Sequence, residues 1–157
     1  MRTGDRYSSD TILEGLRAEV DEGKSSGNYI SAEDIRSNSK VRNFFVDSTL
    51  VEVFYDFLTE WNKVKDDYYK KNLPNLERRP IEFSIGKNYL KLVANNSVVG
   101  FVDKYGNVYK AASWNAPASG VRYYLDDWDR INFDAYGGFL YGNKNLTPRD
   151  ADFYAGR

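Results

Sequence analysis

The residues best suited to chemistry lie between positions 81 and 124, where basic side chains alternate with aromatic rings. This stretch holds five basic side chains and two acidic ones, whereas the whole chain has a formal net charge of -1. Side chains two residues apart on a β-strand share a face, so a strand here would present cations and rings together. Rings stack on unpaired bases, and cations bind phosphates. The sequence therefore predicts a single-stranded nucleic-acid interface (DNA or RNA) formed by Lys91, Lys104, Tyr109, Lys110, Trp114 and Arg122.

The same alternation also has a structural interpretation. Tyr and Trp favour strands, and their rings fill protein cores. The acidic segments on either side of the basic stretch disfavour duplex DNA, which binds best to a broad basic surface. Core packing, nucleic-acid binding and protein binding stay open, because the sequence does not show which sheet face is exposed.

Catalytic chemistry has little support in the composition. The 157 residues include no Cys and no His, which excludes thiol nucleophiles, Cys-based zinc sites and a Ser-His-Asp triad. Glycine-rich phosphate loops are also missing from the sequence. We therefore expect a non-enzymatic protein with no cofactor and no metal. A minor alternative is a divalent-cation site formed by Asp126, Asp127, Asp129 and Asp134; a solvated acidic turn fits these residues better.

The first 80 residues have helical periodicity. A short helix is expected over 9–20, and Ser31-x-x-Asp34 is a weak capping box. The strongest helix begins at Thr49-x-x-Glu52 and must end by Leu73, before Pro74. Its apolar stripe consists of Leu50, Phe54, Phe57, Trp61, Val64 and Tyr68. Burial of this stripe against a sheet is the first interpretation; a protein-interaction surface centred on Phe54, Phe57 and Trp61 is the second.

After Pro80 the apolar period changes to two, which indicates strands. Strands are expected at 81–85, 89–93, 98–102, 108–114 and 121–125, with a turn or short helix from Asp126 and a last edge strand at 137–142. The predicted fold is α+β, with N-terminal helices, one of them long, packed on a C-terminal antiparallel sheet of about five strands. The expected organisation is a helical arm over 1–73, a β domain over 81–141, and a flexible or partner-docked tail over 142–157.

Residues 99–125 carry a family pattern. They read VGFVDKYGNVYKAASWNAPASGVRYYL, which resembles a widespread set of short phage-encoded proteins. The matching positions are Phe101, Val102, Asp103, Lys104, Gly106, Val108, Tyr109, Lys110, Ala112, Ser113, Trp114, Ala116, Pro117, Ala118, Gly120 and Arg122. Asn115 and Ser119 depart from this pattern and lower the positive charge of the loop. The resemblance implies a phage or phage-derived protein of no assigned activity, and the helical first 80 residues fall outside it.

The sequence thus favours a small non-enzymatic phage-type accessory protein that binds single-stranded nucleic acid through a basic aromatic sheet face. The alternative is a protein-binding role, as a virion component, an assembly partner or an inhibitor of a host factor. The polar N-terminus and the lack of a long apolar run favour a protein of the host cytoplasm, or of the virion, without membrane association.

Overall fold

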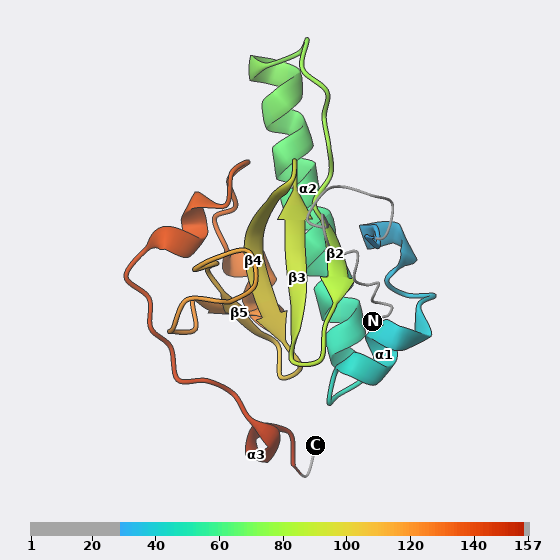
Figure 1. The fold of residues 1–157 in the computed structure, drawn as a ribbon, viewed down its shortest axis with the longest axis vertical. Helices are drawn as coiled ribbons and strands as arrows, with labels where there is room; N and C mark the ends of the chain where they lie inside the picture. The colour runs from blue at the N-terminus through green and yellow to red at the C-terminus, as the bar shows by residue number, and fades with distance from the viewer. Residues whose placement is uncertain (1–28, 156–157) are drawn as a thin grey trace.

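The long helix α2 lies behind a five-stranded antiparallel sheet in Figure 1. The computed structural model describes residues 29–155, so the helix expected over 9–20 lies outside the described residues. The elements before the sheet are η1 (Ala32–Asp34), α1 (Ser39–Phe44) and α2 (Thr49–Asn72). The strands are β2 (Glu82–Ile85), β3 (Tyr89–Ala94), β4 (Ser97–Asp103), β5 (Asn107–Tyr109) and β6 (Tyr123–Tyr124). The short helices η2 (Leu125–Arg130), η3 (Gly138–Tyr141) and α3 (Ala151–Tyr154) follow, and the α+β prediction is confirmed.

The sheet is a meander in which each strand pairs with the next one along the chain. Asn95 and Asn96, both at positive φ, form the tight turn between β3 and β4. β5 is shorter than expected because the chain leaves the ladder after Tyr109. The sheet therefore tapers towards β6.

Helix α2 begins and ends close to the predicted positions. The capping group at its start is Asp47, whose Oδ1 accepts hydrogen bonds from the Thr49 amide at 2.9 Å and the Thr49 hydroxyl at 2.6 Å. The expected Thr49-x-x-Glu52 box is thus replaced by a cap two residues earlier. The helix ends at Asn72, with Leu73 as its C-cap, as the following proline requires.

The core lies between α2 and the inner face of the sheet. Phe54, Phe57 and Trp61 are fully buried there, and the Phe54 ring meets Phe83 of β2 edge-on at 5.0 Å. The prediction of a protein-interaction surface at these three residues is corrected, because all three are buried in the core. Phe54 packs on β2, whereas the segment after β6 covers Phe57 and Trp61 through Phe133 and Phe139. Burial against the sheet therefore holds for the first part of the stripe, and the C-terminal segment buries the rest.

The apolar stripe of α2 shifts along the helix. Tyr68, expected on it, is 38% exposed, whereas Lys65 and Tyr69 take buried positions at that end. The buried side chains at this end are Trp61, Lys65 and Tyr69, which follow one another at a spacing of four residues. This spacing places a lysine on the buried side.

The segment expected as an edge strand at 137–142 is a short helix, η3. The Asp134 carboxylate accepts hydrogen bonds from the amides of Tyr136, Gly138 and Phe139 at 2.8–3.1 Å, and Gly137 has a φ of 80°. These two features turn the backbone away from an extended path. Leu140 is consequently buried in the core.

Residues 142–155 are docked on the chain's own sheet. Leu146 pairs with Val121 in an isolated bridge, and the Tyr154 hydroxyl donates to the carbonyl of Tyr105 at 2.6 Å. Asn107, fully buried, exchanges two hydrogen bonds with the Arg149 backbone at 2.9 and 3.0 Å. The expectation of a flexible or partner-docked tail is therefore corrected for residues 142–155.

Candidate nucleic-acid interface

The outer face of the sheet, turned away from α2, carries three residues in one row across β3, β4 and β5. Lys91 pairs with Phe101, and Phe101 pairs with Tyr109. The intervening residues Leu90 and Val102 point the other way and belong to the core. The expected alternation is thus present, and it places Lys91 and Tyr109 on the same face.

Trp114 reaches this face from the loop that follows β5. The loop closes on itself through a bridge between Ala111 and Pro117, and the Ala118 amide donates to the Lys110 carbonyl at 2.8 Å. Trp114 is half-buried, and the Lys91 Nζ lies 4.6 Å from the centroid of its ring. Lys91 also donates to Asn115 Oδ1 at 3.3 Å. A cation and a flat ring from two distant segments therefore form one contact.

Tyr109 lies on the same face, but its hydroxyl is engaged within the protein. It donates to Asp103 Oδ2 at 2.8 Å, and its ring meets Tyr89 edge-on at 5.8 Å. Burial, together with the charge of Asp103, raises the pKa of Tyr109 well above its ordinary value. Tyr109 therefore supports the outer face from within, and its hydroxyl is committed to Asp103.

Three predicted residues do not join this contact. The Lys110 Nζ lies 4.9 Å from the centre of the Tyr141 ring. One terminal nitrogen of Arg122 donates to the carbonyls of Gly142 and Lys144 at 3.1 and 2.6 Å, which holds the C-terminal segment. Lys104 lines a separate hollow beside α1. The structure thus brings Lys91 and Trp114 together, keeps Tyr109 near them, and places the other three elsewhere.

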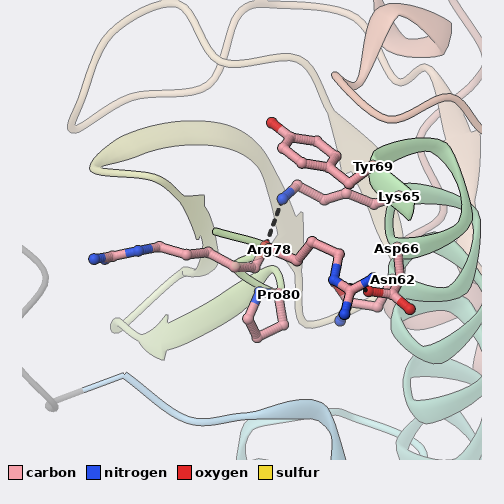
Figure 2. A pocket seen from close by; sticks show the side chains of 7 residues that line it. Asn62, Lys65, Asp66, Tyr69, Arg78 and Pro80 are labelled. Atoms are coloured by element: carbon pink, nitrogen blue, oxygen red, sulfur yellow. Dashed lines mark hydrogen bonds and ion pairs between the residues drawn. The ribbon is translucent and has the colours of Figure 1, made fainter. Parts of the chain in front are cut away.

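A second hollow, of about 220 Å³, lies between α2 and the segment that leads into β2. Figure 2 shows the Lys65 side chain crossing it from α2, with Tyr69 on one side and Pro80 on the other. The Lys65 amine donates to the carbonyl of Arg79, and burial lowers the pKa of Lys65. Sequence reasoning missed this residue, although its position four residues after Trp61 places it on the buried side of the helix.

At this second hollow, Asn62 also links helix α2 to the segment before β2. Its Oδ1 accepts from the Ile81 amide at 2.6 Å, and its Nδ2 donates to the Ile81 carbonyl at 3.1 Å. Together, Asn62 and Lys65 hold the extended segment before β2 against the helix. Hydrogen bonds from both side chains thus join helix and sheet.

The four aspartates of the acidic segment do not converge. Asp126 pairs with Arg149 at 2.7 Å, whereas Asp134 accepts three backbone hydrogen bonds. Within residues 29–155, no group of three or more potential metal ligands is gathered. The divalent-cation alternative therefore has no geometric support in this part of the chain.

The fold and the interface define an α+β protein with a small cation–ring contact on the outer face of its sheet. The chain belongs to the family of unknown function DUF7717, whose model matches residues 28–142. No curated protein and no solved structure matches the chain. The family match begins before α1, so it includes helices that the phage-protein resemblance left outside. No helix among residues 29–155 has both the length and the apolar character needed to cross a membrane.

Proposed function

We propose that this protein is a non-catalytic, phage-type accessory protein that binds single-stranded nucleic acid on the outer face of its sheet. The observation that carries this proposal is the position of the Lys91 Nζ, 4.6 Å from the centre of the half-buried Trp114 ring. An unpaired base would stack on the indole, and the neighbouring ammonium group would bind a phosphate. The sequence pattern of residues 99–125 supports the phage-type assignment.

The contact between Lys91 and Trp114 is preorganised for a ligand. The loop that carries Trp114 is closed by its own backbone hydrogen bonds, and β3 holds the Lys91 backbone between β2 and β4. Binding therefore orders few additional groups, which lowers its entropic cost. The small number of cations at the contact favours a single strand over a duplex, whose affinity depends on many phosphate contacts.

Alanine substitutions test the contact directly. Trp114→Ala is expected to weaken binding of a labelled single-stranded oligonucleotide by about tenfold, since one stacked base contributes about 1–3 kcal/mol. Lys91→Ala is expected to lower the slope of log affinity against log salt by about 0.7. Tyr141→Ala and Lys63→Ala are matched controls, because both side chains are exposed and outside the contact. Equal losses in the substituted and control proteins would contradict the proposal.

A protein-binding role is the second candidate, and because the stripe is buried we propose a different surface for it. Tyr68 is 38% and Tyr136 is 57% exposed, and their rings meet edge-on at 5.5 Å near the end of α2 that extends beyond the sheet (Figure 1). Aromatic residues are enriched at protein–protein interfaces. An oligomer that is seen by sedimentation and is lost in the Tyr136→Asp variant would favour this role. A protein that stays monomeric at all concentrations would exclude self-assembly.

A further inference from the structure

The chain has a second cationic surface, separate from Lys91 and Trp114. An open hollow of about 340 Å³ is lined by residues of α1 and of the β2–β3 and β4–β5 turns, and no residue of the Trp114 contact lines it. Figure 1 shows α1 and these turns at the same end of the molecule. Three lysines surround the hollow: Lys40 from α1, Lys87 from the β2–β3 turn and Lys104 from the β4–β5 turn. The lining contains no acidic residue.

The backbone holds these lysines near one another from three separate segments. Tyr89 pairs with Asp103 at the end of the β3–β4 ladder, which places Lys104 beside the start of β3 and close to Lys87. The Val46 amide donates to the Lys104 carbonyl at 3.1 Å, which joins the end of α1 to the same turn. Bringing three like charges together costs energy unless an anion neutralises them.

The three ammonium groups have no carboxylate partner among the described residues. None of the ion pairs found between residues 29 and 155 involves Lys40, Lys87 or Lys104. The other lining groups include the Asn43 side chain and the apolar side chains of Phe44 and Ile85. A lining that combines cationic donors with apolar side chains suits a ligand with a charged end and a flat or apolar body.

The geometry points to a phosphate-binding site in this hollow. Lysines are point-charge ligands of phosphate, and the Asn43 amide adds a further donor. The ligand class is a nucleotide whose phosphate lies among the three lysines and whose base or sugar lies against Phe44 and Ile85. The phosphate belongs to a free nucleotide or to a nucleic-acid strand, and the two sources carry different phosphate esters.

Calorimetric titration of the full chain with inorganic pyrophosphate and with a thymidine dinucleotide phosphodiester tests this site. Lys87→Ala/Lys104→Ala is expected to weaken binding of the responsive probe at least tenfold. Lys63→Ala/Lys71→Ala removes the same charge from exposed positions of α2 and is expected to stay within twofold of the unsubstituted protein. Lys40→Ala provides a second, single substitution in case the double variant unfolds, and melting by circular dichroism checks each fold.

Each result decides the inference. Selective loss in the Lys87/Lys104 variant supports the site; a response to pyrophosphate alone then assigns a terminal phosphate, and a response to the dinucleotide assigns a strand. Equal loss in both double variants, or no heat with either probe, overturns it. Trp114→Ala is expected to leave pyrophosphate affinity within twofold, so failure of the sheet-face proposal and failure of this site are distinguishable.

Discussion

Asp103 gathers four hydrogen-bond donors where β4 turns towards β5. Its carboxylate accepts from the amides of Tyr105 and Asn107, the Asn107 side chain and the Tyr109 hydroxyl at 2.8–3.0 Å. The side chain is only 9% exposed, so the hydrogen bonds compensate for burial of its charge. This single residue therefore fixes both the turn and the outer-face position of Tyr109. Asp is a common acceptor of backbone hydrogen bonds at such turns.

Tyr109→Phe is expected to destabilise the protein by about 1–2 kcal/mol at neutral pH, because a hydrogen bond to a charged acceptor is lost. The pKa of Tyr109 is raised in the folded state, so the folded protein keeps the phenolic proton after the unfolded chain has released it near pH 10. The contribution of Tyr109 is therefore complete below pH 10 and falls above it. Urea unfolding of the unsubstituted protein and of Tyr109→Phe at pH 7, 10 and 11 measures this contribution. A difference in the free energy of unfolding that stays constant across these pH values would contradict the prediction.

At the scale of elements, the Asn62 side chain connects α2 to the start of the sheet alongside Lys65. Asn62→Ala removes both hydrogen bonds to the Ile81 backbone and leaves two partly buried groups without these partners. We expect a loss of about 2–3 kcal/mol in the free energy of unfolding. Asn72→Ala, at the exposed end of the same helix, is the control and should change stability by less than about 0.5 kcal/mol. Similar losses in both variants would show that the Asn62 pairing contributes little.

The packing of α2 in the core gives a second prediction at this scale. Phe57 is fully buried, and its ring meets Trp61 and Phe133 at 5.8 and 5.5 Å. Phe57→Asp removes about 3–5 kcal/mol of packing and adds a buried charge, so the chain should lose cooperative melting in circular dichroism. Tyr68→Asp, at an exposed position, should melt normally. A folded Phe57→Asp protein would contradict the assignment of the stripe to the core.

At the scale of the whole molecule, local sequence patterns predicted the long helix, the order of the strands as far as β6 and the helix–sheet core. The change from helical to alternating spacing near Pro80 marked the sheet, and Pro74 marked the end of α2. The pattern did not predict the C-terminal segment, since the Asn107–Arg149 hydrogen bonds join positions far apart in the chain. The six residues predicted to form one site lie apart in the structure for a similar reason. Alternation assigns a face only while the strand continues, and Lys110 and Arg122 lie outside β5 and β6.

Fluorescence anisotropy of a labelled single-stranded oligonucleotide, titrated with the full chain at two salt concentrations, tests the central claim most directly. The account predicts saturable binding that weakens as salt increases, with a small slope because few phosphates are contacted. Trp114→Ala measured in parallel should bind about tenfold more weakly at both salt concentrations. No binding by the unsubstituted protein at tens of micromolar, about the non-specific range, would contradict the claim.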